Sequence, residues 1–153
     1  PKSVLRHKLA VSSIKYFTDK KFELVIADSE IKNATRVILC AGKVYYDLVT
    51  ARSEANINNV AIIRVEQLYP FPKEEVIAVL SVYTNAKDFV WCQEESKNQG
   101  AWMYIRDEID TCLSDQQKLI YIGRPASASP ATGFSKVHVV EQTALIKQAL
   151  NLS

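Results

Sequence analysis

RVILCAGKVYYDLV, residues 36–49, contains the clearest structural signal in the chain. Its first five residues form a short apolar run, which is typical of a buried strand. The residues Ala41-Gly42-Lys43 follow and predict a tight turn. Apolar residues then recur at the spacing that places them on one face of a helix, at Val44, Tyr45, Leu48 and Val49. The segment is therefore predicted to form one β-α unit.

Three further β-α units follow the same alternation. Pro72 suits the first position of a helix, and Glu74 and Glu75 suit the positive end of the helix dipole. The expected strands are residues 59–65, 88–93 and 118–122, and the expected helices are residues 73–82, residues 99–113 and a final helix capped by Ser135 that carries Val137, Val140, Ala144, Leu145 and Ala149. Repeated β-α units predict an α/β fold with a mainly parallel sheet.

The pattern is weaker before Thr35. Residues 22–26 (FELVI) alternate enough to form a strand, which we place at the sheet edge in antiparallel orientation. A short helical turn can begin at Ser12, but the segment resembles an arm more than a self-contained element. We therefore divide the chain into an interdomain arm over residues 1–21 and an α/β domain over residues 22–153.

Composition limits the classes of protein to which the chain can belong. A chain of 153 residues, 48% hydrophobic and 24% charged, has the length of one ordinary domain and buries about 68–70% of its unfolded surface. Its net charge of +2, from 19 basic and 17 acidic residues, is too even for a nucleic-acid or membrane-surface footprint. No apolar run approaches the roughly 18–20 residues of a membrane span.

The cysteines and histidines suggest no reactive centre. Cys40, Cys92 and Cys112 are odd in number and far apart, which matches neither a disulfide framework nor a C-x-x-C site and favours a reducing, intracellular compartment. Cys92 lies inside an apolar strand, where a buried structural thiol is expected more often than a reactive thiolate. The spacing of His7 and His138 supports neither a metal site nor a catalytic triad.

In open parallel sheets, ligands and partners meet the carboxyl ends of the strands. At the first of these ends, Gly42-Lys43 invites comparison with a phosphate-binding loop. Such a loop needs an upstream glycine and a hydroxyl residue after the lysine, and both are missing here. The pair therefore predicts an ordinary turn between a strand and a helix.

The densest polar cluster lies between the strand predicted at 88–93 and the following helix. It contains Glu94, Glu95, Asn98 and Gln99. Adjacent carboxylates can act as acid and base. Neighbouring side chains often point in different directions, however, and acidic residues near a helix start are commonly structural. A capping or interface role is therefore favoured over catalysis.

Residues 123–133 (GRPASASPATG) form a small-residue segment stiffened by proline, and its backbone can approach another surface closely. Arg124 can bind a carboxylate or phosphate through its planar guanidinium, and Ser127 and Ser129 can add hydrogen bonds. An ordinary surface connection explains the same composition equally well.

These segments also carry a resemblance to a known family. In order and approximate spacing they resemble the last domain of the thiamine-diphosphate-dependent decarboxylases of the 2-oxoglutarate dehydrogenase complex, and the QEE-x-x-NQGAW and GRPASASPATG blocks separate this family from transketolases at large. The opening PKSVLRHKLAVS resembles the entry to that domain. The matching blocks are RVILCAGKVYYDL (36–48), VAIIRVEQLYPFP (60–72), DFVWCQEESKNQGAW (88–102) and YIGRPASASPATG (121–133).

The resemblance implies a three-layer, transketolase C-terminal-like domain with about five mostly parallel strands and helices on both faces. In such enzymes the cofactor lies between the two preceding domains, and the third domain supports them. A diphosphate-magnesium motif of this cofactor class begins Gly-Asp-Gly, and none of the four glycines here precedes an aspartate. We therefore expect no catalytic, cofactor-binding or metal-binding residue in this chain, whereas the parent enzyme uses thiamine diphosphate and magnesium.

By the same resemblance, the parent enzyme decarboxylates 2-oxoglutarate and passes the succinyl unit to a lipoyl group. The implied partners are the preceding domains of the same chain, the second subunit of a homodimer and the lipoyl-bearing succinyltransferase component, with no nucleic acid and no membrane. The implied location is the cytoplasm in bacteria and the mitochondrial matrix in eukaryotes.

Three hypotheses for the chain follow. The first is a scaffold and interface domain, the second is a sensor that binds an anionic effector such as acyl-coenzyme A or a nucleotide, and the third is a small independent enzyme that uses Cys92 or the Glu94-Glu95 pair. The interface or effector candidates are Glu94, Glu95, Asn98, Gln99, Arg124, Ser127 and Ser129.

Overall fold

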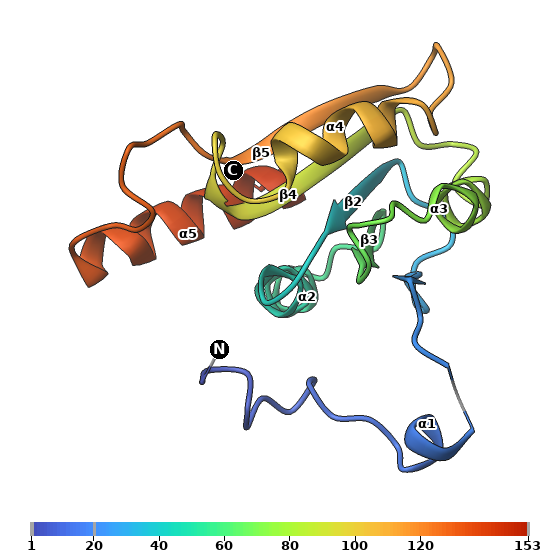
Figure 1. Ribbon diagram of the computed structural model, residues 1–153, viewed down its shortest axis with the longest axis horizontal. Coiled ribbons are helices and arrows are strands. Elements are labelled where there is room, and N and C mark those ends of the chain that lie inside the picture. The colour runs from blue at the N-terminus through green and yellow to red at the C-terminus, as the bar shows by residue number, and fades with distance from the viewer. Residues whose placement is uncertain (1, 20, 153) are drawn as a thin grey trace.

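A five-stranded sheet forms the middle layer of the domain, with strand order β1-β3-β2-β4-β5 (Figure 1). The computed structural model describes residues 2–19 and 21–152. The strands are β1 (Val25–Ile26), β2 (Arg36–Cys40), β3 (Val60–Val65), β4 (Asp88–Ser96) and β5 (Lys118–Arg124). The helices are α1 (Lys15–Thr18), α2 (Val44–Glu54), α3 (Lys73–Leu80), α4 (Trp102–Asp110) and α5 (Ser135–Leu150).

Strand pairing confirms the predicted topology. β2 lies parallel to both β3 and β4, and β4 lies parallel to β5. β1 pairs with β3 in antiparallel orientation at the sheet edge, as predicted. β1 is shorter than the predicted 22–26, because only Val25 and Ile26 lie opposite residues of β3.

The helices cover both faces of the sheet, which gives three layers. Because successive strand residues point to opposite faces, Val37 and Leu39 of β2 belong to one core, and Ile38 and Cys40 belong to the other. The first core also contains side chains of α3 and α4, namely Val76, Leu80, Trp102, Ile105 and Ile109. The second core contains side chains of α2 and α5, namely Val44, Leu48, Leu145, Ile146, Ala149 and Leu150.

Strand β4 is longer than the predicted 88–93, because it continues through Glu94 and Glu95 to Ser96. Its pairing with β5 is irregular after Cys92 and resumes where Ser96 lies opposite Arg124. The prediction that the two glutamates follow the strand was therefore wrong. Glutamate is depleted in strands, but β5 extends alongside and supplies backbone partners for the longer strand.

Helix α5 also departs from its prediction. Phe134 occupies the N-cap position with an extended backbone, and Ser135 is already the first helical residue, so the capping role of Ser135 was wrong. Of the predicted apolar stripe, Leu145 and Ala149 are buried, whereas Val137, Val140 and Ala144 are exposed. For Val137 and Val140 the reason is positional, since the first half of α5 extends past the end of the sheet (Figure 1).

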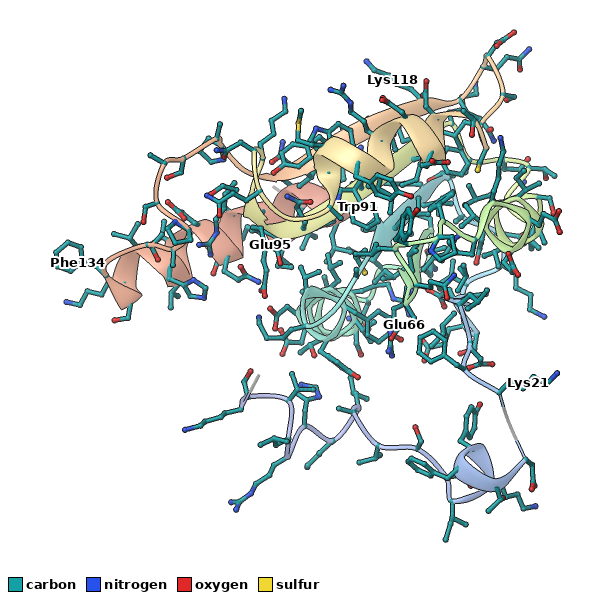
Figure 2. The ribbon with its side chains drawn as sticks, in the orientation of Figure 1. Lys21, Glu66, Trp91, Glu95, Lys118 and Phe134 are labelled. Carbon is teal, nitrogen blue, oxygen red and sulfur yellow. The ribbon has the colours of Figure 1, made fainter. Side chains whose placement is uncertain are left out.

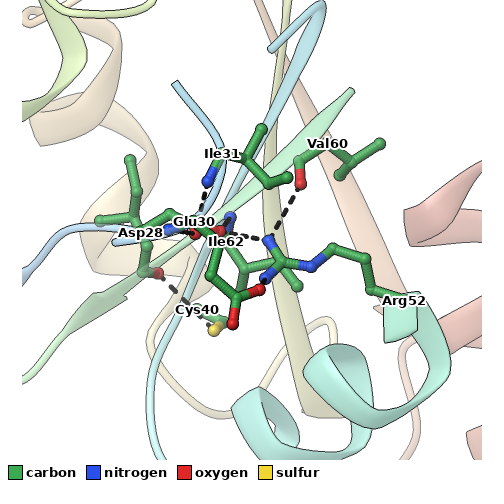
Figure 3. Close-up of polar contacts among 8 residues, drawn as sticks. Asp28, Glu30, Ile31, Cys40, Arg52, Val60 and Ile62 are labelled. Carbon is green, nitrogen blue, oxygen red and sulfur yellow. Dashed lines mark hydrogen bonds and ion pairs between the residues drawn. The ribbon is translucent and has the colours of Figure 1, made fainter. Parts of the chain in front are cut away.

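The buried side chains of Arg52 and Asp28, joined by the exposed Glu30, fix the connection between β1 and β2 to the rest of the domain (Figure 3). Arg52 of α2 donates from Nη1 to the carboxylate of Asp28 and to the carbonyl of Val60, the latter at 3.2 Å. Its Nη2 donates to Glu30 Oε2 at 2.8 Å. Asp28 also accepts a 2.8 Å hydrogen bond from the backbone N–H of Ile62. These bonds join the connection to both α2 and β3.

Candidate functional site at the carboxyl edge of the sheet

Lys43 stands where β2 turns into α2. Gly42 precedes it with φ +74°, a left-handed conformation that glycine adopts easily, so the predicted tight turn is confirmed. Lys43 Nζ lies 2.9 Å from Asp47 Oδ2 and 2.9 Å from Glu94 Oε2. Burial opposes the charged form of Lys43, but the hydrogen bonds to Glu94 and Asp47 outweigh it and raise the lysine pKa. Lys43 is therefore the cation of an ion-pair group.

Gln142 of α5 extends this group across the edge. Its Nε2 donates to Asp47 Oδ2 at 2.9 Å and to Glu94 Oε2 at 3.3 Å. Its Oε1 accepts a 3.3 Å hydrogen bond from Arg124 Nη2. Sequence reasoning missed Gln142, because no local spacing links a mid-helix amide to a strand 48 residues away.

Arg124 is the last residue of β5, and only 9% of its surface is exposed. Its Nη2 donates to His138 Nδ1 at 2.9 Å, and its Nη1 lies 3.4 Å from Glu141 Oε2. Both partners belong to α5. Its Nε is buried and has no hydrogen-bond partner among the described residues. The structure therefore separates Arg124 from the loop with which the sequence grouped it and directs its side chain to a helix.

Gln93 organises the turn between β4 and α4, and sequence reasoning missed it as well. Its buried Oε1 accepts hydrogen bonds from Trp91 Nε1 at 2.9 Å and from the backbone N–H of Trp102 at 3.0 Å. Its Nε2 donates to the carbonyls of Gln99 at 2.8 Å and Ser96 at 3.2 Å. A polar residue at the end of an apolar run was the available signal, since a buried amide must find partners.

Asn98 and Gln99 bind the proline-stiffened loop. Asn98 donates to the carbonyl of Ser127 and accepts from the backbone N–H of the same residue, both at 2.9 Å. Gln99 Nε2 donates to the carbonyls of Ser127 at 3.2 Å and Ser129 at 3.4 Å. The structure thus brings together four of the seven predicted candidates and shows that they contact one another.

Glu94 and Glu95 do not form a carboxylate pair. Glu94 bonds to Lys43 and Gln142 on the face covered by α2 and α5. Glu95 lines a cavity on the opposite face with Trp91 and residues of α4 and its approach (Figure 2). This separation follows from the alternation of side chains along β4 and removes the geometric basis for an acid–base pair at these two positions.

The buried thiols are poor nucleophiles. Burial, and secondarily the charge of Glu94, raises the pKa of Cys92 to about 12. Burial also raises the pKa of Cys40 well above its ordinary value. Thiolates are the reactive form, so the structural interpretation of Cys92 is supported.

A cavity of about 760 Å³ lies beside the ion-pair group, between α2 and α5. Lys43, Asp47 and Gln142 line one end of it, and His7 from the N-terminal segment also contributes to the wall. Its remaining walls are mainly small or apolar, including Ala51, Ala55, Val139, Ile146 and Leu152.

The fold and this edge together define an α/β domain that presents a hydrogen-bonded polar surface at the carboxyl ends of its strands. Within the described ranges, no group of three or more His, Cys, Asp or Glu side chains could hold a metal ion. None of the helices in those ranges is long and apolar enough to cross a membrane. Chemically, the edge can hydrogen-bond a polar protein surface or an anion, because its side chains are amides, carboxylates and cations.

The chain belongs to the 2-oxoglutarate dehydrogenase C-terminal family, whose sequence model matches residues 11–150. It is 51% identical to the 2-oxoglutarate dehydrogenase E1 component of Coxiella burnetii, over 99% of the chain and 17% of that protein. It is 52% identical to the E1 component of Cupriavidus necator, over 97% of the chain and 16% of that protein. The E1 component of Haemophilus influenzae is 47% identical over 99% of the chain. The family resemblance is therefore confirmed, and the chain spans 16–17% of the length of these relatives.

Proposed function

We propose that this chain is the C-terminal support and interface domain of a 2-oxoglutarate dehydrogenase E1 component. The full-length protein is then an oxidoreductase of the tricarboxylic acid cycle that decarboxylates 2-oxoglutarate with thiamine diphosphate. It passes the succinyl unit to the lipoyl group of a succinyltransferase component. The chain contacts the preceding domains of its own polypeptide and the second subunit of a homodimer. The bacterial relatives favour the cytoplasmic location over the mitochondrial one.

The observation that carries this proposal is that polar side chains of the carboxyl edge are already hydrogen-bonded within the domain. Asn98 and Gln99 hold the backbone of the loop that contains Ser127, and Glu94 bonds to side chains of α2 and α5. A surface that is already fixed in shape loses little conformational entropy when a neighbouring domain docks on it. Those side chains therefore suit a preorganised interface better than proton transfer.

Thiamine diphosphate and magnesium belong, in this proposal, to polypeptide outside the chain. Magnesium at a diphosphate is bound by carboxylate and phosphate oxygens. Of the carboxylates of the edge, Asp47 and Glu94 are each paired with Lys43 at 2.9 Å, and Glu95 lines a cavity on the opposite face. The residues present therefore do not fit a magnesium-diphosphate site.

The proposal is tested by the double variant Glu94→Ala, Asn98→Ala in the full-length protein. Each hydrogen bond that is removed typically costs about 0.5–1.5 kcal/mol. We therefore expect weaker dimerisation or lower turnover of 2-oxoglutarate, while circular dichroism shows that the domain remains folded. The matched control is Glu75→Ala, Asn58→Ala, which alters exposed residues of α3 and of the segment after α2. Dimerisation and turnover equal to those of the control would contradict the proposal.

A second candidate function is the binding of an anionic effector such as acyl-coenzyme A or an adenine nucleotide. The buried Nε of Arg124, which has no hydrogen-bond partner among the described residues, favours it. An anion that displaced Glu141 from Arg124 could accept a charge-assisted hydrogen bond from Nη1. Calorimetry of the full-length protein with acetyl-coenzyme A and with AMP tests this candidate. Binding heat that the wild-type protein shows and Arg124→Lys lacks would support this candidate function. The absence of binding heat at millimolar ligand would exclude it.

A further inference from the structure

The N-terminal segment exposes more apolar surface than a solvated tail normally does. We call residues 2–19 the strap. Single exposed apolar residues are common on protein surfaces, but here several large ones occur in one short segment. The exposed fractions are 82% for Leu5, 77% for Val11, 79% for Ile14 and 80% for Phe17. Several large exposed apolar side chains in one segment indicate a surface that binds another polypeptide.

The strap is also held in place on the domain. The rings of His7 and Tyr46 of α2 lie 5.1 Å apart between centroids. Leu9 and Tyr16 of the strap line a cavity of about 360 Å³ together with Tyr46 and Arg64 of the domain. In Figure 1 the strap runs past α2 outside the sheet. One side of the strap, which includes Val11, thus faces the domain, and the exposed side chains of Leu5, Ile14 and Phe17 are left for another partner.

The charge of the strap indicates the chemistry of that partner. Its described charged residues are the exposed cations Lys2, Arg6, Lys8 and Lys15 and the single acid Asp19. Complementary potentials favour contact between a cationic surface and an anionic one. The partner surface should therefore be an apolar groove bordered by carboxylates.

We propose that the strap docks into such a groove on the preceding part of the same polypeptide, an assignment that rests on the proposed function. The alignments cover 99% of the chain but only 17% of the Coxiella burnetii relative and 16% of the Haemophilus influenzae relative, so most of a full-length protein lies outside this domain. The matching family is defined as C-terminal, which places that polypeptide before the strap. Docking within one chain is favoured by a high effective concentration.

Cross-linking identifies the surface on which the strap docks. Benzoylphenylalanine replaces Phe17 in the full-length protein, and the products are separated by mass after irradiation. We expect a cross-link within one chain, at monomer mass, to a peptide that precedes this domain. A cross-link to a second copy, or the absence of any cross-link outside the strap, would overturn the assignment. The yield of the cross-link within one chain should not change on dilution, because an intramolecular contact does not depend on concentration.

Proteolysis of the same full-length protein tests the contribution of the apolar side chains. Trypsin should cut slowly after Lys8 and Lys15 in the wild type and at least about tenfold faster in Ile14→Ser, Phe17→Ser, because losing two buried apolar side chains corresponds to more than one factor of ten in an opening equilibrium. The control Val82→Ser, Met103→Ser replaces residues of 58% and 53% exposure outside the strap and should leave the cleavage rate unchanged. Equal rates in the wild type and the strap variant would contradict the proposal.

These readouts are independent of the test of the proposed function. If Glu94→Ala, Asn98→Ala leaves assembly unchanged while the strap still cross-links within the chain, the edge assignment fails and the strap assignment stands. If the double variant weakens assembly but the strap forms no cross-link within the chain, the strap assignment fails and the edge assignment stands.

Discussion

Arg52 of α2 and Asp28 of the connection between β1 and β2 form an ion pair in which the two side chains are only 5% and 4% exposed. Charges this deeply buried are tolerated only when they are paired and their remaining hydrogen-bonding atoms are satisfied. The carbonyl of Val60 and the backbone N–H of Ile62 supply those further partners. The pair therefore holds together segments that are distant in sequence.

We expect Arg52→Met to lower the free energy of unfolding by about 3–5 kcal/mol, because it leaves the Asp28 carboxylate buried without its cation. Urea denaturation monitored by circular dichroism measures this loss. The control is Asp88→Ala, which breaks the ion pair between Asp88 and Arg36. This pair serves as a control because the Asp88 side chain is 44% exposed. A partly exposed pair should cost only about 0–1 kcal/mol. Similar losses in both variants would mean that burial does not determine the strength of these pairs.

Asn98→Ala should loosen the loop that contains Ser127 without unfolding the domain. The variant removes the two 2.9 Å hydrogen bonds between Asn98 and the backbone of Ser127. We expect a loss of about 1–2 kcal/mol and faster amide hydrogen exchange at Ser127. Asn58→Ala, at an exposed position after α2, is the control and should change neither quantity. Unchanged exchange at Ser127 would show that the two Asn98 hydrogen bonds do not hold the loop.

The sheet could be predicted from the sequence because its information is local. Apolar runs such as residues 36–40 and 60–65 mark strands, and the helical spacing between them marks crossovers, so a mainly parallel sheet could be predicted. The strand order β1-β3-β2-β4-β5 was not predicted, because it depends on pairing between strands that are not consecutive in the chain. Boundaries were less predictable. β4 continues through Glu94 and Glu95 because β5 pairs with it, and this is a tertiary effect that overrides the low strand propensity of glutamate.

The candidate edge could be predicted only in part. The sequence identified Asn98 and Ser127 as polar candidates, but their mutual hydrogen bonds join residues 29 positions apart and leave no periodic signal. The same holds for Gln142, which α5 brings to Glu94 over 48 positions. Side chains contributed by different elements become visible as one group only after the chain has folded.

Thiol reactivity should differ sharply among the cysteines. The pKa of Cys92 is raised to about 12, chiefly by burial, so at pH 8 only about one molecule in ten thousand carries the thiolate. We expect Ellman's reagent to modify the half-buried Cys112 first and to reach Cys40 and Cys92 only after denaturation. Mass spectrometry of the labelled peptides distinguishes the three sites. Native labelling of Cys92 as fast as that of Cys112 would contradict its structural role.

The same pKa shift predicts a loss of stability at alkaline pH. The unfolded thiol has a pKa of about 8.5, whereas folded Cys92 keeps its proton until about pH 12. Between these values the folded state binds more protons than the unfolded state, so the free energy of unfolding falls as pH rises. Below about pH 8 the thiol is protonated in both states, so the stabilisation that Cys92 contributes to the folded state is fully present. Denaturation measured from pH 7 to 10.5 should show a smaller decline in Cys92→Ala, and identical slopes would contradict the assignment.

Gly123→Ala should disturb the carboxyl edge more than its position near a strand end suggests. A Cβ at Gly123 would lie 2.6 Å from the hydroxyl oxygen of Tyr121 and 2.7 Å from the carbonyl oxygen of Gln93. Moving Gln93 displaces the amide that orders the turn before α4, so the clash cannot be relieved by a side chain alone. Overpacking of this kind costs about 1–3 kcal/mol, measured as a lower midpoint of thermal unfolding. Gly133→Ala meets no atom within 4 Å and should change stability by no more than about 0.5 kcal/mol. Equal midpoints for the two variants would show that β4 and β5 can separate at this edge without cost.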